Sequence, residues 1–516
     1  MQRIKTYIIL ALLATGIGSC DKNFEQVNVN PQLASSLDPV YLFSNAQFNA
    51  AIPTFYYQGA IVQQYVNPFT GVPDGGNHNV VLDVNSAITF NYLFKGPTNG
   101  VTNGPVALLT DVINQTKTNA ARSNLYHMAR ILKAYVFMVL VDTYGDVPYT
   151  EAGQGYLKGV NSPKYDDQAA IYPDILNELE QATAALDAAK AIETGDLFYA
   201  GNIAQWKRLG YSLLLRAGMR YTKLDAAKAQ QYVTKAVAGG VMQSVADNAK
   251  IAFNSAFTNP TGSWIQSTEK ANVYLGKPLV DFLKSTADPR LPDIAVLYAL
   301  PGQAAGAPGN TEDNTPANQI GMPFGYDNTT ITTAPGYPGT ATGSGWKYSQ
   351  FNRRIVGKVD APEFFITHAQ TQLLLAEAAQ RGWITGTPDT YYNAGVKAHM
   401  DQMAQYDASG AISGTAQNTY LAANAYNAAT GLQQINTQYW IASFLNGSEA
   451  WANFRRSGYP ALAANAYPGA DPSVKGGFIH RLVYPFNEQS VNAVNYTSAA
   501  SHIGGDNLAT RVFWDK

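Results

Sequence analysis

The stretch NLYHMARILKAYVFMVLVDTYGD, residues 124–146, indicates the class of fold to which this chain belongs. Its apolar residues recur at spacings of one, four and five positions, which places them in a broad stripe along one face of a helix. The members of this stripe are Ile131, Leu132, Tyr135, Val136, Val139 and Leu140. The pattern stops at Gly145, and Pro148 follows at a position where a helix could not continue. We therefore expect one long helix that ends near Gly145.

The same helical spacing recurs further along the chain. It is present in residues 170–190 and 205–224, and in residues 364–383, which are followed after a short turn by residues 389–406. The last two segments are expected to form one helical hairpin, whose length and pattern of small and aromatic residues resemble a tetratricopeptide unit of about 34 residues. These segments predict an all-α fold of tetratricopeptide-like helix pairs joined by long irregular loops.

Residues 300–346 have a different character, because they are rich in Gly, Pro, Thr and Asn and show almost no periodicity. Such a segment is a long loop or an irregular insertion. Its aromatic residues and those just after it offer apolar surface to bury, so we expect the insertion to be partly ordered. These residues are Phe324, Tyr326, Tyr337, Trp346 and Tyr348.

The only cysteine, Cys20, lies at the end of a segment with the layout of a secretory signal peptide. Arg3 and Lys5 precede an apolar run over residues 7–17, and the small residues Gly18 and Ser19 follow it. A lone cysteine after small residues resembles a bacterial lipobox, in which cleavage leaves the cysteine as a lipidated first residue. We expect residues 1–19 to be a signal peptide, and residues 20–33 to be a lipid anchor and tether. The alternative is an ordinary signal with Cys20 near the cleavage point by chance.

The composition fits an exported body over residues 34–516. The chain has 35 Lys and Arg against 37 Asp and Glu, a formal charge of −2, which argues against nucleic acid as a partner. Hydrophobic residues make up 46% of the chain, enough for a large core, and charged residues only 14%, against a usual value of about 25%. No later apolar run approaches the roughly 18 residues of a membrane-spanning helix. We expect a single helical body held at the membrane by lipid.

Common catalytic signatures are missing from the sequence. There is no HExxH, Walker, GxSxG or strand-linked GxGxxG motif, and the six histidines are scattered without metal-ligand spacing. Carboxylate pairs such as Asp142 with Asp146, or Asp166 with Asp167, are the only residues that suggest glycosidase chemistry, and such pairs are common in helix caps and turns. We therefore predict no catalytic residue, no metal and no cofactor.

Several short motifs occur together over nearly the whole chain. They are DKNFEQVNVNP at 21–31, VDTYGDVPYTEAGQG at 141–155, PKYDDQAAIY at 163–172, WKRLGYSLLLRAGMR at 206–220, DPRL at 288–291, LAEAAQRGW at 375–383, WIASFLNGSEAWANFRRSGYP at 440–460 and RLVYP at 481–485. In this order they resemble the SusD/RagB family of outer-membrane lipoproteins, in particular its SusD-like nutrient-binding branch.

The resemblance implies a function as well as a fold. Proteins of this family are lipid-anchored at the outer membrane and face outwards. They capture a nutrient oligomer, commonly a glycan and sometimes a peptide, and deliver it to a SusC-like TonB-dependent transporter; they are binders and not enzymes. Two other classes stay open from the residues alone, namely an exported hydrolase and a scaffold protein whose helical surface binds another protein.

The family-like motifs have a structural explanation in terms of their own residues. Asp288 can cap a helix or form a turn that Pro289 fixes, while Arg290 supplies a planar donor for a buried carboxylate or for carbonyls. Arg455 and Arg456 follow an amphipathic helix whose C-terminal end favours cations. We expect these charged residues to hold the scaffold together and not to contact a ligand.

The predicted ligand-binding residues are aromatic residues outside these motifs and polar residues near them. Sugars stack their apolar faces on aromatic rings, while their hydroxyls need polar partners. Trp264, with Gln266 beside it, and Trp346, with Tyr348 beside it, lie in Gly- and Ser-rich segments, and Tyr326 lies in the insertion. Replacing either tryptophan with Ala should weaken binding by roughly 1–3 kcal/mol with little change in stability. The alternative is that each ring fastens its own loop to the body. The remaining tryptophans, Trp206, Trp383, Trp440, Trp451 and Trp514, are expected to pack in the core.

Overall fold

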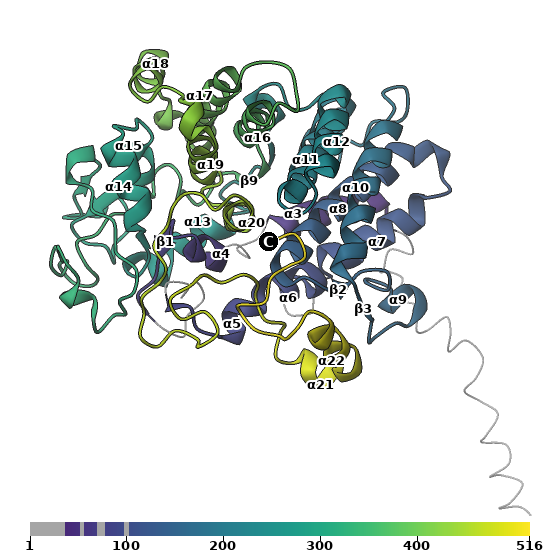
Figure 1. The fold of residues 1–516 in the computed structure, drawn as a ribbon, viewed down its shortest axis with the longest axis horizontal. Coiled ribbons are helices and arrows are strands. Elements are labelled where there is room, and N and C mark those ends of the chain that lie inside the picture. Colours follow the sequence, from purple (N-terminus) through teal and green to yellow (C-terminus); the bar gives the residue numbers. More distant parts are fainter. Residues whose placement is uncertain (1–36, 52–55, 70–77, 98–102) are drawn as a thin grey trace, which may run out of the picture.

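A computed structural model describes residues 37–51, 56–69, 78–97 and 103–516, which form a mainly helical body with a few small sheets (Figure 1). The predicted long helix is α8 (Ser123–Tyr144). Its residues from 134 to 144 are buried on every side, so this half of the helix is central and not merely amphipathic. Gly145 ends it as expected: its φ is +78°, and its N–H donates to the carbonyl of Val141. Cys20 and the predicted signal and tether lie outside the described residues.

Antiparallel helix pairs build the body, as the sequence predicts. α8 packs against α10 (Gln168–Ala185), α11 (Ile203–Met219) packs against α12 (Ala226–Gly239), and α16 (His368–Gln380) packs against α17 (Pro388–Tyr406). α10 begins where Asp167 accepts a hydrogen bond from the N–H of Ala169. The prediction of an all-α fold of helix pairs is therefore confirmed.

One boundary in the predicted hairpin is wrong. Residues 364–366 do not begin the helix; they belong to strand β9 (Glu363–Ile366), which pairs with β4 (Ala249–Ile251). Thr367 sets the boundary, because its hydroxyl accepts the N–H of Gln370 while the Gln370 side chain accepts the N–H of Thr367. Because of this reciprocal cap, α16 begins at His368, directly after Thr367, and the preceding residues 364–366 stay extended.

Shorter helices complete the body. They are α3 (Pro39–Ala50), α4 (Tyr56–Ile61), α5 (Asp83–Ser86), α6 (Ile88–Lys95), α7 (Pro105–Thr116), α9 (Gly155–Lys158), α13 (Pro260–Gln266), α14 (Lys277–Ser285), α15 (Leu291–Ile294), α18 (Gly414–Ala423), α19 (Gly431–Ala442), α20 (Gly447–Ser457), α21 (Glu488–Val491) and α22 (Ala493–His502). Single 3₁₀ turns occupy 120–122, 220–222, 245–247, 268–271, 316–318, 331–333, 408–410 and 428–430. Among the described residues, no helix combines the length and apolar character needed to cross a membrane.

The strands are short, antiparallel and mostly paired in twos. Besides β4 and β9, they are β1 (Tyr65–Val66), β2 (Val147–Pro148), β3 (Tyr165–Asp166), β5 (Tyr274–Leu275), β6 (Ala295–Tyr298), β7 (Glu312–Asp313) and β8 (Gln350–Phe351). β1 pairs with β5 and β2 with β3, while β6 lies between β7 and β8. In the first pair Tyr65 lies opposite Leu275, and Val66 lies opposite Tyr274.

Two hydrophobic clusters are distinguishable. The main core extends through the helix pairs and contains Trp206, Trp440, Trp451 and Trp514, each no more than 1% exposed; Trp383 is only half-buried against it. The second, which we call the loop aromatic cluster, consists of buried Val66, Tyr274, Met322, Ile331, Ala334, Trp346 and Tyr348 with partly buried Phe69, Phe324, Tyr326 and Tyr337. The aromatic residues of the irregular insertion thus bury surface together, as expected.

Buried ion pairs hold the helices to one another. Arg220 binds Glu449 at 2.7 Å and Asp142 at 3.1 Å, and so joins the end of α11 to α20 and α8. Arg456 on α20 binds Glu377 on α16 at 2.7 Å. Every one of these side chains is at most 5% exposed. Arg290 binds the buried carboxylate of Asp288, as its motif predicts. The charged residues of the family-like motifs are therefore parts of the scaffold.

Candidate functional site

The loop aromatic cluster brings together three of the predicted ligand-binding residues, Trp346, Tyr348 and Tyr326. The ring of Trp346 lies 5.8 Å from that of Tyr274 and 5.9 Å from that of Phe69. The hydroxyl of Tyr274 accepts the backbone N–H of Trp346 at 2.9 Å, which fixes the chain at this point. The three residues therefore lie in a defined packing arrangement, although they come from an irregular segment.

Glycine makes this close packing possible. Gly345 has a φ of +80°, and a Cβ at this position would lie 2.4 Å from the Tyr274 hydroxyl. A side chain here would therefore be strained by the backbone and would collide with the ring that positions Trp346. The Gly-rich composition that suggested a loop is thus needed for the approach of two aromatic residues.

The members of this cluster differ in exposure. Trp346 is 9% exposed and Tyr348 only 2%, whereas Phe69, Phe324 and Tyr326 are partly exposed. A ligand that stacks on this surface would therefore meet the partly exposed rings first, with Trp346 and Tyr348 supporting them from behind.

Two buried hydroxyls in the cluster have no hydrogen-bond partner within the described part of the chain. They belong to Tyr337 and Tyr348, whose rings lie 6.4 Å apart. Burial raises the pKa of Tyr348 to about 12, so its hydroxyl keeps its proton and can donate. Leaving such groups unpaired costs roughly 1–3 kcal/mol each, so a bound polar molecule that pairs with them would be favoured.

Trp264 and Gln266 lie apart from this cluster, on α13. The expectation that they lie in a loop is wrong, because the Asn259 side chain caps the N–H of Gly262 and Pro260 occupies the first helical turn. Trp264 packs partly buried against the main core, 6.3 Å from the ring of Tyr65. Tyr65 belongs to the main core and its neighbour Val66 to the loop aromatic cluster. Strand β1 therefore lies between Trp264 and the loop aromatic cluster.

The side-chain amide of Gln266 is already hydrogen-bonded to backbone carbonyls of the protein. Its amide donates to the carbonyls of Gly357 at 2.7 Å and Arg353 at 3.3 Å. It also borders a cavity of about 520 Å³ whose charged walls include Lys358 and Asp407. These two are paired at 2.8 Å, and Arg353, Arg354 and Asp360 also border the cavity. The five predicted residues therefore do not form one site.

The carboxylates considered for catalysis serve structural roles. Asp142 accepts hydrogen bonds from Tyr172 and Trp514 in addition to Arg220, and Asp166 accepts the N–H groups of Tyr149 and Thr150. These interactions are those of helix packing and turns, as expected for carboxylate pairs of this kind.

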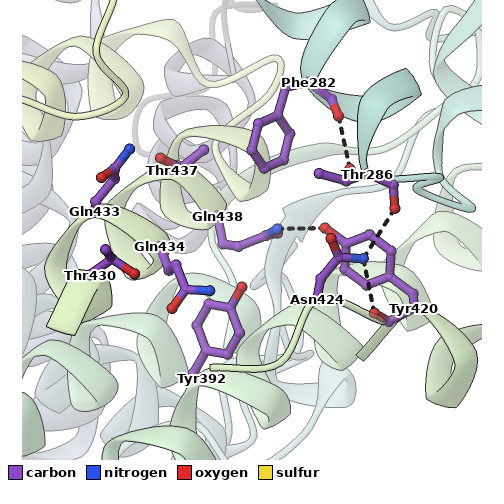
Figure 2. Close-up of a pocket in the computed structure, with 10 residues that line it drawn as sticks. All are labelled: Phe282, Thr286, Tyr392, Tyr420, Asn424, Thr430, Gln433, Gln434, Thr437 and Gln438. Atoms are coloured by element: carbon purple, nitrogen blue, oxygen red, sulfur yellow. Dashed lines mark hydrogen bonds between the residues drawn. The ribbon is translucent and has the colours of Figure 1, made fainter. Parts of the chain in front are cut away.

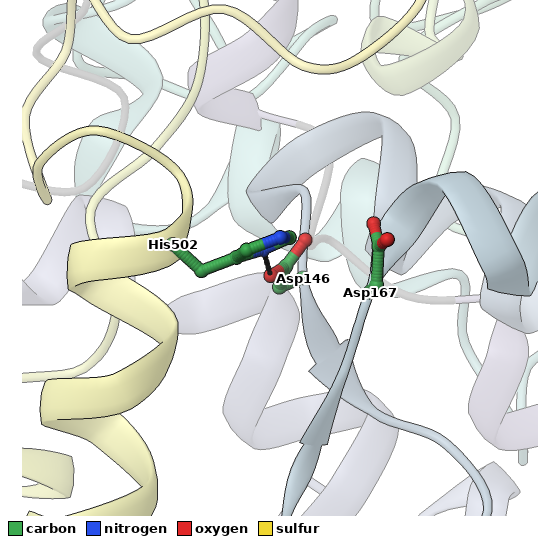
Figure 3. Close-up of side chains that lie close together, drawn as sticks. All are labelled: Asp146, Asp167 and His502. Atoms are coloured by element: carbon green, nitrogen blue, oxygen red, sulfur yellow. Dashed lines mark hydrogen bonds and ion pairs between the residues drawn. The ribbon is translucent and has the colours of Figure 1, made fainter.

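One cluster of titratable residues was not foreseen from the sequence. Figure 3 shows His502 at the end of α22 facing Asp146 and Asp167, with its ring nitrogen 2.6 Å from Asp146. The hydrogen bond with Asp146 raises the pKa of His502. Asp146 also accepts the N–H of Gln168, so both carboxylates cap the start of α10. The histidine lies 356 positions along the chain from Asp146, and no local pattern could have signalled the pairing.

Residues 31–485 match the SusD-like family described as "Starch-binding associating with outer membrane". Comparison with curated proteins gave no match.

Solved structures resemble the chain over nearly its whole length. A chitin-binding protein is 27% identical with a TM-score of 0.77, covering 93% of this chain and 100% of its own. A Bacteroidetes SusD-like protein is 25% identical with a TM-score of 0.79 and the same coverage. A chitin-binding SusD homologue from Flavobacterium johnsoniae, 24% identical with a TM-score of 0.75, covers 93% of this chain and 98% of its own and shares the fold.

Proposed function

The chain belongs to the SusD-like family, and from that membership we propose that it is an outer-membrane lipoprotein that captures glycan oligomers and delivers them to a SusC-like TonB-dependent transporter. The match over residues 31–485 is the observation that carries this proposal. The role is that of a binder and includes no chemical step. Residues 1–19 act as the signal peptide, and Cys20 carries the lipid that holds the body, residues 34–516, on the cell surface.

A glycan ligand is supported by the similar chitin-binding protein and by the chemistry of the loop aromatic cluster. Partly exposed rings can stack on the apolar faces of sugars. The hydroxyls of Tyr337 and Tyr348, which have no hydrogen-bond partner among the described residues, are buried behind these rings and can pair with a sugar hydroxyl or an acetamido group when the ligand displaces the rings that cover them. We therefore place the transported glycan at this cluster, with Trp346, Tyr348 and Tyr326 among its residues.

The glycan site is tested by removing the two hydroxyls. In the double variant Tyr337→Phe/Tyr348→Phe, calorimetric titration with chito- and malto-oligosaccharides should show binding weaker by roughly fivefold or more, since each lost hydrogen bond is worth about 0.5–1.5 kcal/mol. Thermal stability should hold or rise, because neither hydroxyl has a hydrogen-bond partner in the described part of the chain. The matched control is Tyr156→Phe, whose ring is 96% exposed on α9, and it should bind like the wild type.

The outcomes of this titration separate the candidate ligands. Unchanged affinity of the double variant for every saccharide that the wild type binds would contradict the placement of the site. Binding of oligopeptides with no binding of saccharides would replace the glycan by a peptide.

The delivery role is tested by identifying the proteins that co-purify with this protein from the membrane. Affinity purification of the tagged protein in mild detergent, from cells grown on the inducing glycan, should recover a SusC-like barrel. Recovery of the lipoprotein alone under these conditions would contradict the delivery role.

A further inference from the structure

A cavity of about 280 Å³ lies between α14, α17, α18 and α19, and it shares no residue with the loop aromatic cluster. Figure 2 shows side chains from these elements gathered around it, with Phe282 of α14 on one side and Tyr392 of α17 on another. Its volume is close to the lower end of the range of about 300–1,000 Å³ that small-molecule sites occupy. The space suits one or two sugar rings better than an extended chain.

The lining is polar but carries no formal charge. It consists of aromatic rings, side-chain amides and threonine hydroxyls, without any Asp, Glu, Lys or Arg. A charged ligand would find no partner of opposite sign there, and a purely apolar one would leave the amides unpaired. An uncharged sugar matches both parts of the lining, because its C–H face can lie on a ring while its hydroxyls pair with amides.

The floor of the cavity is buried and held in place. Gln438 is 2% exposed, and its amide donates to the hydroxyl of Tyr420 at 2.9 Å (Figure 2). The carbonyl oxygen of the same amide accepts a hydrogen bond from Arg290 at 2.8 Å, and Arg290 is itself paired with Asp288. The Arg290–Asp288 pair thus fixes the orientation of the amide from behind while its charges stay balanced and out of the cavity.

Other lining side chains are free to bind. Within the described residues, the side chains of Thr430, Gln433 and Thr437 take part in no hydrogen bond, although all three border the cavity. Gln434, by contrast, is already bound to the backbone of residues 425 and 427. A fixed floor with free amide and hydroxyl groups around it is the arrangement of a pre-organised site.

We propose that this cavity is a second saccharide site, which binds one neutral sugar unit between Phe282, Tyr392 and the free side chains of Gln433 and Thr437. It shares its ligand class with the proposed function but not its residues. A glycan chain could therefore be held at the loop aromatic cluster and at this cavity independently.

Threonine methyl groups report on the cavity directly. In protein labelled at threonine methyls, N-acetylglucosamine or glucose at millimolar concentration should shift the signals of Thr430 and Thr437, while Thr234 on α12 stays unchanged. Gln433→Ala should weaken binding through the loss of one hydrogen bond, so the dissociation constant measured from the Thr430 signal should rise by roughly three- to tenfold. Gln433 is exposed, so this variant should fold normally. Gln231→Ala, which removes an exposed amide on α12, is the matched control and should leave the constant unchanged.

This experiment distinguishes loss of binding at the loop aromatic cluster from loss of binding at the second cavity. Tyr337→Phe/Tyr348→Phe should leave the Thr430 shift intact, so loss of oligosaccharide binding with a preserved Thr430 shift assigns the two effects to different places. No shift at Thr430 and Thr437 with any neutral saccharide, or an unchanged constant in Gln433→Ala, would overturn the second site even if the loop aromatic cluster binds glycan. A shift caused by a blocked dipeptide and not by sugars would also overturn it.

Discussion

At the scale of single residues, Glu363 is a buried titratable group next to the first turn of α13, the helix of Trp264 and Gln266. Its carboxyl is fully buried and is bound by Asn259 and Thr261, which start the helix that carries Trp264. Burial raises the pKa of Glu363 to about 8, against an ordinary value of 4.5. The folded state therefore keeps a proton that the unfolded chain releases above about pH 4.5, and stability falls as the pH rises through that window.

The variant Glu363→Gln should remove this penalty while keeping the shape of the group. We expect it to be more stable than the wild type at pH 8, by on the order of 1–3 kcal/mol, and equal to it near pH 4.5. Urea unfolding at both pH values measures the difference, and Glu180→Gln on the surface of α10 should change stability little at either. A less stable variant at pH 8 would mean that Glu363 is ionised in the folded protein.

Trp346 is expected to contribute to stability as well as to binding. Because it is 9% exposed and packs against Phe69 and Tyr274, Trp346→Ala should cost roughly 3–5 kcal/mol within the loop aromatic cluster. This differs from the small stability change that its position in a Gly-rich segment suggests. Thermal unfolding tests it, with Trp346→Phe as the milder variant that keeps an aromatic ring. An unchanged unfolding profile for Trp346→Ala would show that the ring is not packed there.

At the scale of elements, the bidentate pair of Arg456 and Glu377 joins α20 to α16. Both side chains are 1% exposed, and the two nitrogens of Arg456 lie 2.7 and 2.8 Å from the carboxylate oxygens. Burial alone would raise the pKa of Glu377, yet Arg456 lowers it to about 2, so the pair is charged at every ordinary pH.

Breaking this pair on one side should destabilise the protein strongly. Arg456→Met leaves the buried Glu377 with only the partly exposed Arg381 and the amide of Asn436, and should cost up to about 3–5 kcal/mol. Arg456→Met/Glu377→Leu should recover much of that loss. The exposed pair of Lys235 and Glu180 is the control, and Lys235→Met should cost less than about 1 kcal/mol. Equal effects of Arg456→Met and Lys235→Met in urea unfolding would contradict the role assigned to the buried pair.

Sequence periodicity predicted the long helices well and the short elements poorly. α8 was predictable because its apolar stripe is long and Gly145 ends it. The apolar residues Phe364, Phe365 and Ile366 fit a helical pattern equally well, and only pairing with β4, more than a hundred residues away, makes them a strand. α13 was missed because a seven-residue helix begun by Asn259 and Pro260 contains Gly and Ser within it.

The candidate sites were only partly predictable, because they depend on residues that are distant in sequence. Composition singled out Trp346, Tyr348 and Tyr326 as candidates, and it marked Tyr337 only as an aromatic residue of the insertion. No local pattern signals that the Tyr337 hydroxyl lacks a hydrogen-bond partner among the described residues. The second cavity combines Tyr392 and Tyr420 with Gln438. The one hint in the sequence is the group of glutamines on α19, Gln433, Gln434 and Gln438, of which only Gln433 has an amide without a hydrogen-bond partner among the described residues.

At the scale of the whole molecule, the proposed attachment to the membrane depends on Cys20, which lies outside the described part of the chain. Cys20→Ala should move the protein from the membrane fraction to the soluble fraction, because the proposed anchor is the lipid on the Cys20 thiol. Sedimentation after cell lysis measures this, and Ser19→Ala, which leaves the cysteine in place, should stay with the membrane. A Cys20→Ala protein that still sediments with lipid would contradict the anchor.

The separation of the two hydrophobic clusters has a consequence for how the molecule opens. Since the loop aromatic cluster is packed apart from the main core and meets it at β1, the irregular segment can detach as a cooperative unit while the helix pairs stay folded. Such sub-global opening exposes the backbone around Trp346 to proteases and to hydrogen exchange long before global unfolding. A glycan that pairs with Tyr337 and Tyr348 would bind only the closed form, and would therefore slow cleavage in this segment in proportion to its occupancy.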